Sequence, residues 1–149
     1  MDNFPRKLDL ALDVDMSFFR SVYDVHGIGN GGWDYDYSDS LSSFTRLSTA
    51  PECLAFRSLS ILCGGFAMQD SFNRSRGIAR LDFMRGLPTA GSTEAGACFD
   101  FFENWCIGLG VDCIEFHMDT GFGRVSGRER WMRLRGYKEG FRTYLKDIH

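Results

Sequence analysis

The chain has 149 residues, of which 44% are hydrophobic and 25% are charged, and this fits one domain with a sizeable core. Aromatic residues make up 15%, which argues against a disordered chain, and the formal net charge of -3 argues against a general nucleic-acid binder. No apolar run is long enough to span a bilayer, and the first ten residues lack the apolar core of a signal peptide, so a cytoplasmic location is the default expectation.

The cysteines and histidines give no sign of a metal centre. The five cysteines are odd in number and include no C-x-x-C pair, so we expect reduced thiols that act as small core residues. The three histidines are scattered, and none lies at zinc-finger spacing from a cysteine. We therefore expect no structural metal.

The N-terminal third predicts a strand, a helix and an irregular segment. Loose alternation over residues 5–12 favours a first strand. Apolar residues then recur at helical spacing over residues 15–26, with Asp13 or Asp15 as the N-cap and Gly27 as the stop.

The segment from residue 27 to residue 51 is rich in Gly, Asp and aromatic residues, and a short helix is expected over Leu41–Leu47. Trp33, Tyr35 and Tyr37 stand at alternate positions. They could line a substrate entrance, because long loops often carry function, or they could cover the edge of the core.

The middle of the chain predicts three antiparallel strands. Residues 52–58 and Ile61–Gln69 form a hairpin, with a bulge expected at Gly64 and Gly65. A turn-like stretch follows, and Gly77–Arg85 is the third strand of the set.

A loop and a long amphipathic helix come next. Pro88 and Gly91 mark the loop, Ser92 is the expected N-cap, and Glu94 lies in the first turn. The backbone N–H groups at such a helix start can bind an anion. The helix is expected to end at Gly108 and Gly110, and its apolar stripe consists of Cys98, Phe99, Phe102, Trp105, Cys106 and Leu109.

The C-terminal part predicts a strand over Val111–Met118, in the middle of the sheet, then a short basic helix ending at Gly136 and a last strand over Tyr137–Ile148. The whole chain therefore reads as one α+β domain, residues 1–149, with a mixed, mostly antiparallel sheet flanked by helices.

The element order, together with the stretches ENWCIGLG, VDCIEFHM, RERWMRLRGY and FRTYLKDI, resembles the GCN5-related N-acetyltransferase (GNAT) family. In that family the short helix ends in a Gly-aromatic pair, here Gly136 and Tyr137. The resemblance covers nearly the whole chain in element order. It implies an acyltransferase that uses acetyl-CoA or another acyl-CoA to acylate the amine of a small molecule or a protein.

The resemblance also implies a pyrophosphate-binding loop of the pattern Q/R-x-x-G-x-G/A at the start of the long helix. The matching positions here are Ala90, Thr93 and Ala95, of which only Ala95 agrees with the pattern, and the charge of Glu94 would oppose a diphosphate. The residues expected to hold the cofactor are Gly91, Ser92, Thr93, Ala95, Gly96 and Arg85.

Catalytic groups are partly missing from the family positions. The tyrosine that protonates the CoA thiolate in active members corresponds to Met132, and a frequent asparagine corresponds to Val125. Glu115 and His117 share one face of their strand, and they are the candidate bases together with Asp82. The alternative is an ordinary surface or edge pair.

Eight Lys and Arg residues lie between Arg124 and Lys146. They could hold CoA phosphates or an acidic partner, or they could be the solvated face of a helix and a strand. The divergent motifs leave a second function open. In that function the chain is a catalytically inactive GNAT-fold protein used for assembly, as a homo-oligomer or with a protein partner. The chain resembles in size the small acetyltransferase-like virion proteins of bacteriophages.

Overall fold

The computed structural model describes residues 3–27, 36–69, 75–116, 125–138, 140 and 146. The chain forms two compact units, Met1–Asp119 and Thr120–His149. In chain order the elements are β1 (Arg6–Lys7), α1 (Asp13–His26), α2 (Tyr37–Thr49), β2 (Cys53–Arg57), β3 (Ile61–Gln69), β4 (Gly77–Gly86), α3 (Ser92–Leu109), β5 (Cys113–Phe116) and α4 (Val125–Leu134).

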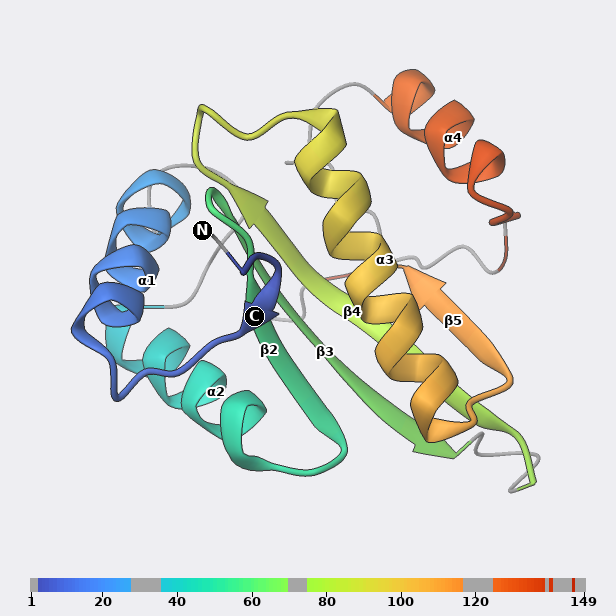
Figure 1. Cartoon of the computed structure of the whole chain (residues 1–149), viewed down its shortest axis with the longest axis horizontal. Coiled ribbons are helices and arrows are strands. Elements are labelled where there is room, and N and C mark those ends of the chain that lie inside the picture. The colour runs from blue at the N-terminus through green and yellow to red at the C-terminus, as the bar shows by residue number, and fades with distance from the viewer. Residues whose placement is uncertain are drawn as a thin grey trace. The chain divides into compact units, whose positions relative to one another are not determined.

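The first unit is built on a five-stranded sheet in the order β1-β2-β3-β4-β5 (Figure 1). The strands from β1 to β4 pair antiparallel, whereas β5 runs parallel to β4 and is reached through α3. The predicted α+β fold with a mixed, mostly antiparallel sheet is therefore confirmed. Among the described strands β5 lies at the edge of the sheet, and the C-terminal strand expected beside it lies almost entirely outside the described residues.

Two consecutive glycines of β3 show how the helices divide between the faces of the sheet. A Cβ atom on Gly64 would meet Leu47 and Phe44 of α2, whereas one on Gly65 would meet Phe102 of α3. Because neighbouring strand residues point to opposite faces, α2 and α3 lie on opposite sides. The Cβ of Gly65 would come within 2.7 Å of the Phe102 ring, so the close packing of α3 on the sheet requires glycine there.

The face that carries α1 and α2 has a core of Leu8, Phe18, Phe19, Val22, Phe44, Ala55 and Leu62. The ring of Phe44 is central, since it packs edge-on against Phe19 at 5.3 Å and Phe83 at 5.0 Å. On the opposite face α3 buries Cys98, Phe99, Phe102 and Cys106. Trp105 is half-buried and Leu109 is 48% exposed, so the buried stripe is narrower than the predicted one.

Three local expectations at the N-terminal end were wrong. The first strand is limited to Arg6–Lys7, because the chain then turns into α1. Leu12 is the N-cap of α1 and makes no side-chain capping bond, since Asp15 lies inside the helix and is fully buried. The second helix is longer than predicted and starts after Asp36, whose carboxylate caps it through the Asp39 N–H at 2.7 Å.

The second unit contains α4, whose end follows the predicted pattern. Gly136 has a φ of 90°, a left-handed conformation that glycine adopts at low cost, and the Tyr137 N–H bonds back to the Met132 carbonyl at 3.0 Å. Arg135 lies over the Trp131 ring at 5.2 Å. In the part of the chain that the structure describes, no helix is both long and apolar enough to cross a membrane.

Candidate functional site

The ladder between β3 and β4 is irregular in the middle of β4, next to the last described pair with β5. The parallel pairs with β5 run from Ile78–Cys113 to Leu81–Phe116, while β4 itself continues to Gly86. At the same point the register with β3 shifts, so that Asp82 is an extra residue in β4 opposite Gly64 and Gly65. The predicted bulge is thus confirmed, and its inserted residue is Asp82. Bulges often lie next to active sites, because they redirect side chains and end strand pairing.

The loop after β4 leads to the N-terminus of α3, which has no capping side chain. The Leu87 N–H bonds to the Ser60 carbonyl at 2.8 Å, and the Ala90 N–H bonds to the Leu87 carbonyl at 2.9 Å, which together fix the loop. The N-cap of α3 is Gly91, not the predicted Ser92, and glycine has no side chain with which to cap the helix. Within the described residues we find no acceptor for the N–H groups of residues 92–94, which point out of the helix start.

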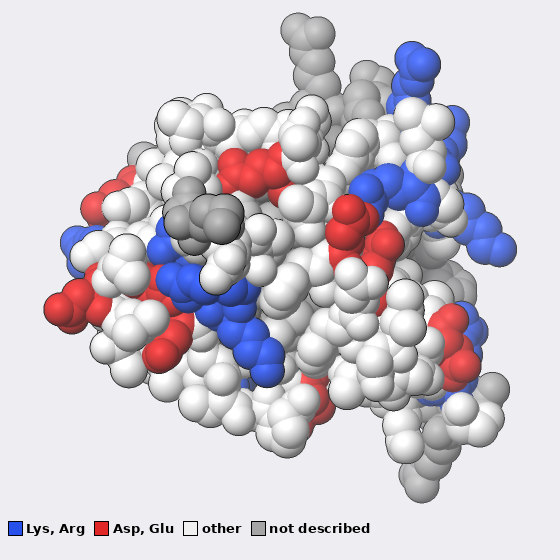
Figure 2. Space-filling model, viewed as in Figure 1, with Lys and Arg blue, Asp and Glu red and all other residues white. Residues whose placement is uncertain are grey.

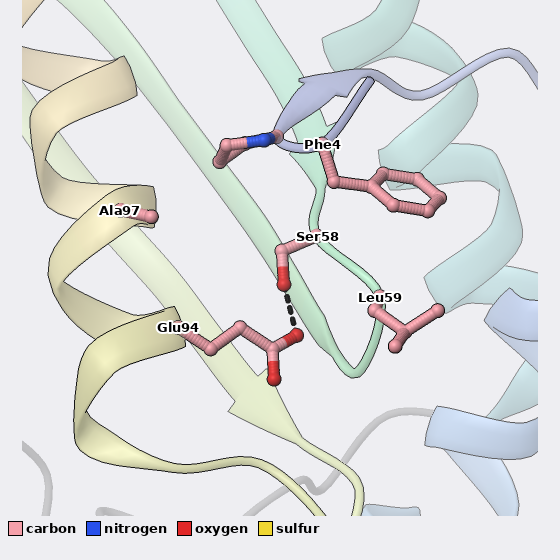
Figure 3. A pocket seen from close by; sticks show the side chains of 6 residues that line it. Phe4, Ser58, Leu59, Glu94 and Ala97 are labelled. Carbon is pink, nitrogen blue, oxygen red and sulfur yellow. Dashed lines mark hydrogen bonds between the residues drawn. The ribbon is translucent and has the colours of Figure 1, made fainter. Parts of the chain in front are cut away.

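The side chain of Glu94 does not lie over this helix start. Its carboxylate accepts hydrogen bonds from the Ser58 hydroxyl and the Ser60 N–H in the turn between β2 and β3 (Figure 3). The carboxylate borders a shallow pocket of about 330 Å³ whose other walls include Phe4, Leu59 and Ala97. The expectation that Glu94 places its charge on the anion position is therefore wrong in geometry, because the carboxylate is bonded to a different part of the sheet.

Of the three candidate bases, two are described. Glu115 forms an ion pair with Arg80, whose guanidinium nitrogens lie 2.9 and 3.1 Å from one carboxylate oxygen. The register pairs Arg80 with Phe66, so both charged groups lie on the face of α1 and α2. Asp82 is exposed at the bulge, and His117 lies outside the described residues. Glu115 and Asp82 thus each lie next to a member of Leu81–Phe116, the last described pair of β4 and β5.

The residues expected to bind the cofactor fall into two groups. Five of them lie together at the start of α3, and these are Gly91, Ser92, Thr93, Ala95 and Gly96. Arg85 is elsewhere, because it pairs with Leu62 and so points to the face of α1 and α2, where its guanidinium also bonds to the Met84 carbonyl at 3.0 Å.

Of the aromatic residues expected at a substrate entrance, Trp33 and Tyr35 lie outside the described residues. Tyr37 packs on the core, with its ring 5.8 Å from Phe19 and 5.3 Å from Tyr23, and the Arg20 guanidinium lies 4.4 Å above it. The position of Tyr37 therefore supports the alternative in which it covers the edge of the core.

Sequence reasoning missed two groups that shape this region. Ser58 holds Glu94 across 36 positions of the sequence, and the imidazole Nε2 of His26 lies 2.7 Å from the Gly86 carbonyl across 60 positions. No local pattern in the sequence joins residues so far apart. Both contacts fix the two ends of the loop that precedes α3.

The three buried thiols between α3 and the sheet are poor nucleophiles. Burial raises the pKa of Cys63 well above its ordinary value, and a hydrogen bond with Cys98 adds to this shift. Burial likewise raises the pKa of Cys106 to about 12. All five cysteines are free, as expected, and these three are fully buried. They act as core residues of the layer between α3 and the sheet.

A scan against family models and a search of curated proteins give no match. Solved structures match the fold over nearly the whole chain. The aminoglycoside N-acetyltransferase AAC(6')-Iy, solved with a CoA-derived bisubstrate analog, has a TM-score of 0.74 at 11% identity, and the match covers 97% of each chain.

A transcriptional regulator from Bacillus halodurans has a TM-score of 0.71 at 12% identity, with 95% of this chain and 98% of that chain covered. A GNAT family acetyltransferase from Staphylococcus aureus has a TM-score of 0.64 at 12% identity, with 97% of this chain and 100% of that chain covered. The chain therefore has the fold of the GNAT acetyltransferases.

Proposed function

We propose that this protein is an N-acyltransferase that transfers an acyl group from acetyl-CoA or another acyl-CoA to an amine, with residues 1–149 acting as one domain. The observation that carries the proposal is the combination of two features in this fold. Asp82 forms a bulge next to Leu81–Phe116, the last described pair of β4 and β5, and the loop from the end of β4 leads to an uncapped helix start at Gly91. The aminoglycoside N-acetyltransferase AAC(6')-Iy, which has the same fold, was solved with CoA and with a CoA-derived bisubstrate analog.

In this proposal the N–H groups of Ser92 and Thr93 hold the pyrophosphate of CoA, because amides at a helix start favour a negative charge. Gly91 and Gly96 give the backbone room for close approach. The acyl arm lies along β4 beyond Leu81 in this proposal, next to the Asp82 bulge.

The reaction forms a bond between the amine nitrogen and the acyl carbon and breaks the thioester C–S bond. The attacking amine must first lose a proton, and we assign this proton to a base among Glu115, Asp82 and His117. The CoA thiolate then takes a proton from solvent, because Met132 has no proton to donate. Trp33 and Tyr35 border the acceptor amine in this proposal.

Ligand-dependent stability tests the proposal directly. At an acetyl-CoA concentration of 100 times Kd, binding to the folded state raises the free energy of unfolding by about 2.7 kcal/mol, which corresponds to a Tm increase of about 5–10 °C for a chain of this length. Pantetheine, which lacks the pyrophosphate, serves as the control and should give a much smaller shift. An unchanged Tm at millimolar acetyl-CoA would contradict acyl-CoA binding.

A second candidate function is a catalytically inactive GNAT-fold protein that serves in assembly, for example in a bacteriophage virion or an infected host cell. The observation that favours it is Met132, which is only 8% exposed and replaces the proton-donating tyrosine of the family. This function predicts a stable oligomer or a complex with a protein partner. Light scattering gives the mass of the particle, and a monomer that turns over acetyl-CoA would exclude this function.

A further inference from the structure

Glu94 occupies a special position in α3. Gly91 is the N-cap, so Ser92, Thr93 and Glu94 are the first three residues of the helix. A glutamate at the third position normally reaches back to the N–H of the N-cap residue, in the arrangement known as the capping box. In this protein the carboxylate instead bonds to Ser58 and Ser60, which belong to the turn between β2 and β3.

The turn that holds Glu94 is itself fixed by the side chain of Arg57. Arg57 donates hydrogen bonds to the carbonyls of Ser58 at 3.1 Å and Leu59 at 3.2 Å, and its guanidinium is almost completely buried. The charges of Arg57 and Glu94 attract each other. The preference of the carboxylate for the turn therefore has an electrostatic component in addition to its two hydrogen bonds.

We infer that Ser58 is a positioning residue that keeps the Glu94 carboxylate away from the start of α3 and so leaves the backbone N–H groups there open to an anion. This inference rests on the proposed function in one respect, namely that the anion is the pyrophosphate of CoA. Figure 3 shows the two side chains directed toward each other from α3 and the turn. When Ser58 is lost, Glu94 turns back to the Gly91 N–H and competes with the anion.

Two variants separate this role from a merely structural one. In Ser58→Ala the carboxylate keeps its charge but loses the hydroxyl, and we expect CoA affinity measured by titration calorimetry to fall about three- to tenfold, in the range of charge effects at helix ends. In Glu94→Ala the same hydrogen bond is lost, but no carboxylate remains to compete. We expect this variant, and the double variant with Ser58→Ala, to bind CoA at least as tightly as the wild type.

A measurement without CoA tests the positioning itself. In 15N-labelled full-length protein the Gly91 amide should exchange fast in the wild type and become protected in Ser58→Ala, because Glu94 then accepts its hydrogen bond. The double variant should return the Gly91 amide to fast exchange. Ser48→Ala is the control, because it removes a serine hydroxyl far from this site. In α2 that hydroxyl donates to the Phe44 carbonyl, and its loss should leave the Gly91 amide unchanged.

The outcomes are distinguishable. If Gly91 becomes protected in Ser58→Ala but the wild type binds no CoA, the positioning holds and the proposed function fails. If Gly91 exchange is the same in the wild type and Ser58→Ala, the inference is overturned whatever the CoA result. Equal losses of CoA affinity in Ser58→Ala and Glu94→Ala would also overturn it, because the hydrogen bond would then be acting only on the stability of the turn.

Discussion

The buried ion network around Asp15 allows a quantitative prediction. Asp15 is fully buried in α1, where its carboxylate accepts hydrogen bonds from Arg6 at 2.6 and 2.8 Å, from Arg57 at 3.0 Å and from the Asp9 N–H at 2.8 Å. Arg57 is 4% exposed, and its guanidinium lies 3.7 Å from the centre of the Phe18 ring. Figure 2 shows Lys and Arg side chains gathered over β1 with acidic groups beside them.

The substitution Asp15→Asn removes the negative charge and leaves the Arg57 guanidinium buried without its counter-ion. Breaking a buried ion pair from one side costs about 3–5 kcal/mol, a large part of the about 5–15 kcal/mol that stabilises a typical domain. Urea unfolding followed by far-UV circular dichroism and tryptophan fluorescence measures the loss. The additional substitution Arg57→Met should recover much of it, since no uncompensated charge then remains in the core.

The pH dependence of this loss has a defined sign. Burial opposes ionisation of Asp15, but the hydrogen bonds from Arg6, Asp9 and Arg57 outweigh it and hold the pKa of Asp15 below its ordinary value of 3.8. The stabilisation is therefore complete above the unfolded-state pKa and is lost as the pH falls through the folded-state value. The gap in unfolding free energy between the wild type and Asp15→Asn should thus shrink below about pH 4.

An exposed pair supplies the control. Arg20 and Asp24 form an i,i+4 ion pair in the same helix, with side chains 56% and 60% exposed. Asp24→Asn should cost no more than about 0.5 kcal/mol, because such pairs are screened by water. A loss below about 1 kcal/mol in Asp15→Asn, or a similar loss in both variants, would refute the reasoning from burial.

Two further predictions concern packing and the thiols. Gly65→Ala places a Cβ 2.6 Å from the Arg80 carbonyl and should lower the unfolding free energy by about 1–3 kcal/mol. Gly108→Ala places a Cβ that no described residue outside the local helix backbone approaches within 4 Å, and it should raise the unfolding free energy by about 0.5–1 kcal/mol. Thermal melts of both variants check this, and equal effects would contradict it. In native protein at pH 8, a disulfide reagent such as DTNB should modify the half-exposed Cys53 and Cys113 well before the three buried thiols, and five equally fast thiols would contradict the described core.

The sequence by itself determined the type and the order of the elements from β1 to α4. Helical periodicity, glycine stops and β-rich runs lie within single segments, so local chemistry decided them. Ile61–Gln69 was predicted with the observed bounds, and Gly110, with a φ of 73°, ends α3 as the sequence indicated. The order of these elements, together with the C-terminal stretches quoted above, carried the resemblance to the GNAT family, and the solved structures have the same fold.

Only the tertiary structure decided where the polar groups point. Sequence reasoning made Asp13 or Asp15 a helix cap and Glu94 a charge on the anion position, since each stands at a helix start. The structure buries Asp15 between two arginines and bonds Glu94 to Ser58. The physical reason is that a carboxylate bonds to the donors within its reach, and Arg57, Ser58 and Ser60 come within reach of these helices only after the sheet has formed.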